Sequence, residues 1–162
     1  MSTATRGVLN STSSGTSASA ADAELIMRLY DLRREPVMRQ ARNWFATFPA
    51  DSAEDVMKVV MNFSSMDSAY FRQVCSYWEM AASLVLHGTL NEALFFDTNG
   101  EIIFVYAKLR PVLDGIRTTM GSPEFLSQTE TLIKRNPVAQ KRLEVTTERL
   151  KRMAQMRAGN NR

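Results

Sequence analysis

Residues 67–88 read DSAYFRQVCSYWEMAASLVLHG and contain the clearest structural pattern in the chain. Asp67 can cap the start of a helix, and Gly88 can end it in a left-handed conformation. The spacing of three and four residues between apolar side chains is typical of one buried helix face. We therefore predict a central helix over residues 68–87. Its apolar positions are Tyr70, Phe71, Val74, Cys75, Trp78, Ala81, Ala82, Val85 and Leu86.

The sequence before this helix indicates two further helical segments. Asp22 is the expected N-cap of the first, which extends to Phe48 with a kink or break at Pro36, because proline lacks an amide donor and clashes with the preceding turn. A short helix with Val56, Val60 and Phe63 on one side follows an approximate capping box at residues 51–54. These segments would supply partners for the central helix.

The sequence after the central helix contains four more start signals. A capping box begins at Thr89, a second at Thr98 introduces an expected long helix over residues 101–117, and Pro111 would bend that helix. Residues 122–124, Ser-Pro-Glu, and residues 136–137, Asn-Pro, are typical helix starts. The last helix is expected over residues 137–157. The chain is therefore predicted to form an all-α bundle of six or seven helices.

Residues 92–106 also fit a second interpretation. An apolar run precedes Asn99-Gly100, and another follows it, which is the pattern of a β-hairpin with a primed turn. The helical period continues to Ile116, which a strand does not require, and this favours the helix.

The composition sets the expected domain organisation. Residues 1–21 are rich in Ser, Thr and Ala and are predicted to be a disordered leader, residues 22–157 a single helical domain, and residues 158–162 a flexible tail. The longest apolar run, residues 102–107, is far shorter than the roughly 20 residues of a membrane span. No secretory signal pattern is present, and a single cysteine fits a reducing compartment, so we expect a cytoplasmic protein.

The residue content argues against several kinds of chemistry. The chain has one cysteine and one histidine, which excludes a disulfide scaffold and a site built from several of these ligands. Cys75 and His87 lie twelve residues apart on one predicted helix, about 18 Å along its axis, so they cannot form a nucleophile pair. No glycine-rich phosphate loop occurs. We therefore expect a non-catalytic protein without a metal or cofactor.

Glu79 is the single most informative polar residue. It follows Trp78 among the apolar positions of the central helix, and a buried carboxylate requires a compensating partner. We expect a salt bridge with Arg39 or Arg42 of the first helical segment. An exposed position and a functional acid are the alternatives.

Positive charge is concentrated at the C-terminal end. Residues 134–162 contain nine cationic and two acidic residues, whereas the rest contains eleven and fifteen, although the net charge of the chain is only +3. The candidate contact patch is Lys141, Arg142, Arg149, Lys151 and Arg152. These cations either support the packing of the helix or contact a polyanion. Residues 134–162 contain no aromatic side chain, so base stacking is excluded.

Three short stretches carry a resemblance to a known family: Tyr77-Trp78-Glu79, residues 87–92 (HGTLNE) and residues 108–111 (KLRP). Together with the aromatic-containing segment from Phe125 to Ile133, they resemble a family of small helical bacterial proteins known as a domain of unknown function. The resemblance covers about residues 25–135. It implies an all-helical fold and a bacterial source, and it supplies no catalytic residues. Some relatives carry an N-terminal membrane segment, where this chain has its Ser/Thr tract.

These observations favour a non-catalytic helical interaction or structural protein whose partner is a protein, either a second copy or another chain. The alternative is weak electrostatic binding of nucleic acid or another anionic surface through the helix at residues 137–157.

Overall fold

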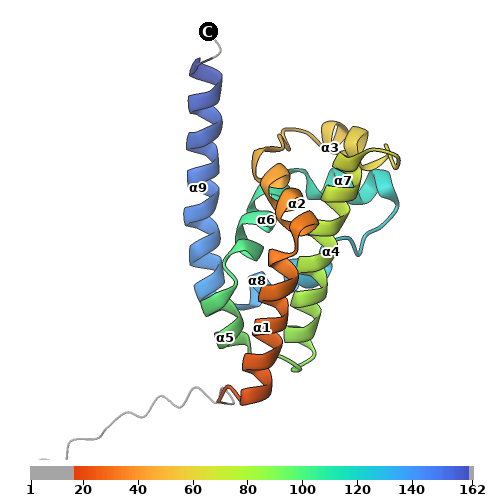
Figure 1. Cartoon of the computed structure of the whole chain (residues 1–162). Helices are drawn as coiled ribbons and strands as arrows, with labels where there is room; N and C mark the ends of the chain where they lie inside the picture. Colours follow the sequence, from red (N-terminus) through yellow and green to blue (C-terminus); the bar gives the residue numbers. More distant parts are fainter. Residues whose placement is uncertain (1–16, 161–162) are drawn as a thin grey trace, which may run out of the picture.

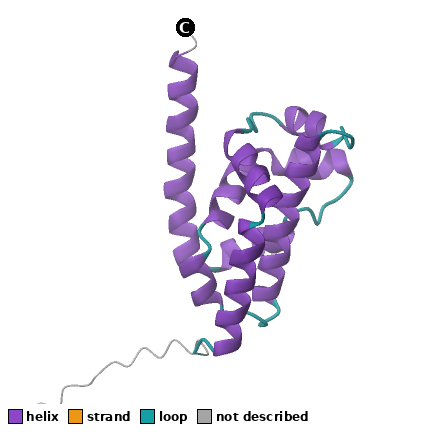
Figure 2. Ribbon diagram, in the orientation of Figure 1, coloured by secondary structure: helices purple, strands orange, loops and turns teal. Residues whose placement is uncertain are grey.

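The computed structural model describes residues 17–160, and within that range the chain consists of helices joined by short loops, without a β-strand (Figures 1 and 2). The prediction of an all-α fold is confirmed. The described residues form nine α-helices and one 3-10 turn, more than the six or seven expected. They are α1 (Ala20–Arg34), α2 (Pro36–Thr47), α3 (Ala53–Val60), α4 (Met66–Leu86), α5 (Glu92–Thr98), α6 (Glu101–Leu109), η1 (Arg110–Val112), α7 (Leu113–Met120), α8 (Ser127–Arg135) and α9 (Pro137–Asn160).

The central helix is α4, and its apolar face forms the middle of the core. Val74, Trp78, Ala81 and Ala82 are fully buried. The helix contacts α2, α3 and α8, and Figure 1 shows it running through the body beside α1 and α2. The two alanines leave room for close helix contacts, while Trp78 fills the space beside Phe95.

Two prolines divide expected helices into separate ones. Pro36 is the first residue of α2, where a backbone amide has no helical acceptor, so the missing donor loses no hydrogen bond. The expected helix is therefore interrupted between α1 and α2. Pro111 ends the expected helix over residues 101–117: α6 stops at Leu109, and a 3-10 turn leads into α7. The hairpin interpretation of residues 92–106 is wrong, because α5 and α6 occupy this segment with Asn99 buried between them.

Several expected helix ends differ from the structure. Ser65 rather than Asp67 caps α4, Asn91 rather than Thr89 caps α5, and α6 follows Gly100, which supplies no side-chain cap, rather than Thr98. The N-cap of α1 is Ser19 rather than Asp22, which lies at the third helical position and completes a capping box. Residues 20 and 21 are therefore helical, and residues 1–16 of the expected leader lie outside the described residues. Residues 122–124 do not start α8, which begins at Ser127 after Leu126. At the other end, α9 extends to Asn160, past the expected end at residue 157.

The two halves of α9 differ in their packing. Ala139 and Leu143 in the first half are buried against the body, where α9 contacts α6 and α8. From Lys151 to Met156 every residue is exposed. Figure 1 shows the C-terminal end of α9 standing apart from the body. No helix among the described residues is long and apolar enough to cross a membrane.

Candidate functional site

Glu79 lies on α4, half-buried, and faces the start of α8. Its carboxylate accepts hydrogen bonds from the backbone amides of Gln128 (2.8 Å) and Thr129 (3.0 Å) and from the Thr129 hydroxyl (2.8 Å). These amides belong to the first turn of α8, where no preceding carbonyl is available as an acceptor. The residue before α8, Leu126, has a φ of 56° and a side chain that cannot accept a hydrogen bond. Glu79 therefore caps α8 from a neighbouring helix.

The expected salt bridge between Glu79 and Arg39 or Arg42 is wrong. Arg39 is exposed on α2. Arg42 instead pairs with Glu101 at the start of α6, with Nε 2.8 Å and Nη2 2.5 Å from carboxylate oxygens. The hydrogen bond from Arg42 to Glu101 raises the pKa of the guanidinium, although partial burial opposes the shift. Arg42 also donates to the carbonyl of Arg33, so this one side chain links α2, α6 and the end of α1.

A second polar cluster, not identified from the sequence, surrounds Glu130 on α8. Its carboxylate lies 2.8 Å from Nη2 of Arg117 and 2.5 Å from Nζ of Lys134, and accepts from the Tyr106 hydroxyl at 3.0 Å. Partial burial opposes ionisation, but the hydrogen bonds from Lys134, Arg117 and Tyr106 outweigh it and lower the pKa of Glu130 to about 2. Only the Glu130–Lys134 spacing was visible in the sequence.

Cys75 and His87 occupy separate positions on α4. Cys75 is buried, and burial followed by the charge of Glu79 raises the pKa of its thiol, so the thiol stays protonated near neutral pH. His87 is the C-cap of α4, and its Nδ1 lies 2.8 Å from the carbonyl oxygen of Ser83. The part of the chain that the structure describes holds no group of three or more metal-ligand side chains.

The predicted basic patch is confined to α9, and its members have different environments. Arg142 donates to the carbonyl of Phe96 at 2.8 Å and so ties α9 to α5. Lys151 pairs with Glu148 at 2.9 Å. Lys141, Arg149 and Arg152 are exposed and form no ion pair within residues 17–160. The five cations therefore do not make one free surface.

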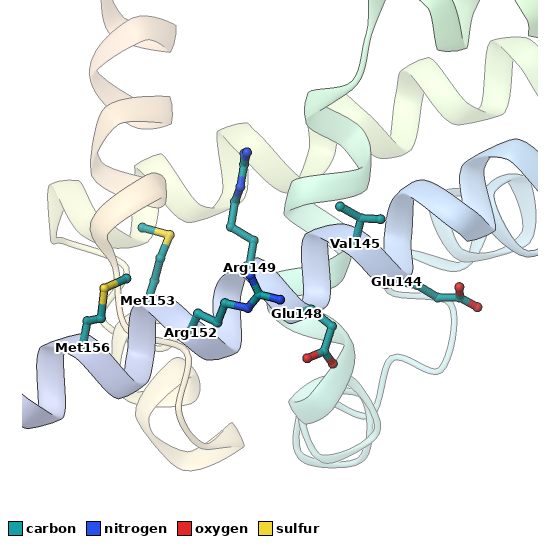
Figure 3. Close-up of a pocket in the computed structure, with 7 residues that line it drawn as sticks. All are labelled: Glu144, Val145, Glu148, Arg149, Arg152, Met153 and Met156. Atoms are coloured by element: carbon teal, nitrogen blue, oxygen red, sulfur yellow. The ribbon is translucent and has the colours of Figure 1, made fainter.

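One side of α9 carries both signs of charge together with apolar side chains. We call it the charged face of α9, and Figure 3 shows its members along the helix. Val145 and Met156 on this face are 70% and 64% exposed. A shallow hollow runs along the face, and its lining consists of Glu144, Val145, Glu148, Arg149, Arg152, Met153 and Met156.

A larger apolar groove lies on another part of the surface and had no sequence signal. It has a volume of about 950 Å³ and lies between the α3–α4 corner, α4 and the segment joining α7 to α8. Its apolar walls include Met61, Phe63, Phe71, Met120 and Phe125. Met61 and Phe63 are 58% and 66% exposed, far more than the core side chains.

One cation lies at the rim of this apolar groove. The guanidinium of Arg72 lies 5.6 Å from the ring centre of Phe63 and donates to the hydroxyl of Ser68 at 2.8 Å. Ser68 in turn donates to the carbonyl of Val60, the last residue of α3. These contacts hold the α3–α4 corner against α4 and keep Phe63 at the edge of the groove.

Residues 18–136 match the model of a family described as a domain of unknown function, DUF4760. The match confirms the resemblance expected from the sequence and ends one residue before α9 begins. No curated protein and no solved structure matches the chain.

Proposed function

The chain belongs to the DUF4760 family, whose function is unknown, and we propose that it is a non-catalytic protein-interaction domain that receives an apolar segment of a protein partner in the apolar groove. The observation that carries the proposal is the exposure of Met61 and Phe63 on the wall of this groove. The groove lies within residues 18–136, the region that matches the family.

The chemistry of the groove suits a protein segment. Large apolar side chains left in contact with water are typical of surfaces that become buried in a complex. Methionine adapts its shape to different apolar partners, and both Met61 and Met120 line the groove. An amphipathic helix that lays its apolar face into such a groove is a recurring mode of protein recognition.

Two charged groups at the groove, Glu79 and Arg72, are already occupied by structural contacts. The carboxylate of Glu79 accepts three hydrogen bonds from α8, and Arg72 is held by Ser68 and Phe63. Neither group is placed as a free acid or base, which favours binding over catalysis. The proposal includes the cytoplasmic location and bacterial source expected from the sequence.

The test is affinity purification of the full chain from its native cells, comparing wild type with Met61→Glu and Phe63→Glu. We expect both variants to lose a protein that wild type retains, because each places a charge on the apolar contact. Met27→Glu and Val37→Glu are matched controls, since both side chains are exposed on α1 and α2 away from the groove. Thermal melts of all four variants check the fold.

The proposal fails if the groove variants and the controls retain the same proteins.

The alternative is binding of nucleic acid through α9. It predicts that the double variant Arg149→Glu and Arg152→Glu loses binding to random DNA at about 50 mM salt, where phosphate contacts are strongest. The acids Glu144 and Glu148 beside these arginines, and the internal contacts of Arg142 and Lys151, make this alternative weaker.

A further inference from the structure

We infer that the charged face of α9 binds the same face of a second copy of this chain, with the two helices antiparallel around a two-fold axis near residue 150. This contact is separate from the apolar groove. It uses residues 145–156 of α9, which lie outside the region that matches the family.

The order of charges along α9 carries the inference. On the charged face, Glu144 and Glu148 come first, and Arg149 and Arg152 follow. In an antiparallel pair the first half of each helix lies beside the second half of the other. Glu148 and Arg152 are equally far from residue 150, so Glu148 of each copy lies opposite Arg152 of the other. A parallel pair would instead place like charges together.

The apolar side chains of the face fit the same arrangement. Val145 lies at nearly the same distance before residue 150 as Met156 lies after it, so Val145 of one copy meets Met156 of the other. Both side chains are mainly exposed in the single chain. The symmetric contact therefore contains two ion pairs and two apolar contacts, and the apolar contacts cover side chains that are otherwise in water.

The projecting position of α9 leaves this contact accessible. Residues 151–156 are exposed, and the C-terminal end of α9 stands apart from the body (Figure 1). Two copies can therefore join through these arms. The contact area is small, so the dimer is expected to be weak and sensitive to salt.

Arg149 provides a distinctive feature of the arrangement. Arg149 lies one residue from the two-fold axis, so in the antiparallel pair it lies opposite Arg149 of the second copy. The two guanidinium groups repel each other. Arg149→Ala should therefore strengthen the dimer. Binding of a polyanion predicts the reverse, because the same change removes a phosphate contact.

The experiment is analytical ultracentrifugation of the full chain at about 50 mM salt, up to about 1 mM protein. We expect reversible dimerisation of wild type, and at least a tenfold weaker dimer for Glu148→Arg and for Arg152→Glu, because each places like charges opposite each other. A mixture of the two variants should form a heterodimer. The Glu148→Arg copy then carries arginine at both positions, and these arginines lie opposite the two glutamates of the Arg152→Glu copy. Glu24→Arg, at an exposed position of α1, is the control for the charge change.

The results of this dimerisation test can be distinguished from those of the partner-binding test of the apolar groove. The inference is overturned if wild type stays monomeric throughout the range, or if it dimerises but the reversed variants dimerise equally well. Loss of DNA binding in Arg149→Ala without any dimer would assign the face to a polyanion instead. The groove variants Met61→Glu and Phe63→Glu should leave dimerisation unchanged.

Discussion

Glu79 and Thr129 lie fifty residues apart in the chain, and the carboxylate of Glu79 accepts hydrogen bonds from both the backbone amide and the hydroxyl of Thr129. Thr129 is fully buried at the third position of α8. The contact supplies the cap that Leu126, at the N-cap position, cannot provide. It also joins the central helix to the last helix of the family domain.

Glu79→Ala should lower the free energy of unfolding by about 1–3 kcal/mol, because buried amides at the start of α8 lose their acceptor. Glu79→Gln keeps one acceptor oxygen and should cost less. Urea denaturation measures both changes, and hydrogen exchange should show faster exchange at Gln128 and Thr129. Glu124→Ala, an exposed acid just before α8, is the control. Equal stability of Glu79→Ala and this control would contradict the capping role.

Trp78→Ala should lower the free energy of unfolding by about 3–5 kcal/mol, because the fully buried indole leaves a cavity in the core. Trp78→Phe, which keeps an aromatic ring in the same space, should cost less. Thermal and urea unfolding monitored by circular dichroism measure the difference. A melting temperature unchanged in Trp78→Ala would show that this side chain does not support the core.

Gly115→Ala should destabilise the protein by about 1–3 kcal/mol, although alanine is normally the better helix former. A Cβ atom at residue 115 on α7 would lie only 2.6 Å from the Cβ of Ala53 at the start of α3. Gly159→Ala on α9 meets no neighbour and should be neutral or stabilising. Ala53→Gly should recover part of the loss when combined with Gly115→Ala. A stabilising Gly115→Ala would show that α3 and α7 are farther apart.

Glu130→Gln should lower stability at neutral pH, and the deficit should shrink as the pH falls from about 4.5 to about 2. The pKa of Glu130 is lowered to about 2 in the folded chain, from a usual value of 4.5. The ionised carboxylate therefore stabilises the fold fully above its unfolded pKa, and this contribution is lost as protons bind. Urea denaturation between pH 2 and pH 7 measures the effect, with Glu24→Gln as the exposed control. A deficit that stays constant with pH would contradict the assignment.

The candidate site was only partly predictable. The sequence identified Glu79 as a residue that requires a partner, yet the partners are two backbone amides and a hydroxyl of α8. Backbone donors have no signature in the sequence, and their availability depends on the left-handed conformation of Leu126. The apolar groove was likewise invisible, because Phe63 continues the spacing of Val56 and Val60, which normally indicates a buried face, whereas α3 ends at Val60 and leaves Phe63 exposed.

The sequence by itself determined that this protein is helical, where its central helix lies and where most helices begin. Those features depend on spacing, capping residues and prolines within a few positions of one another, which act locally. Only the tertiary structure decided that Arg42 pairs with Glu101, that Glu79 caps α8 and that the second half of α9 stays exposed. These contacts join residues about fifty or more positions apart, or depend on which faces the packed helices leave uncovered.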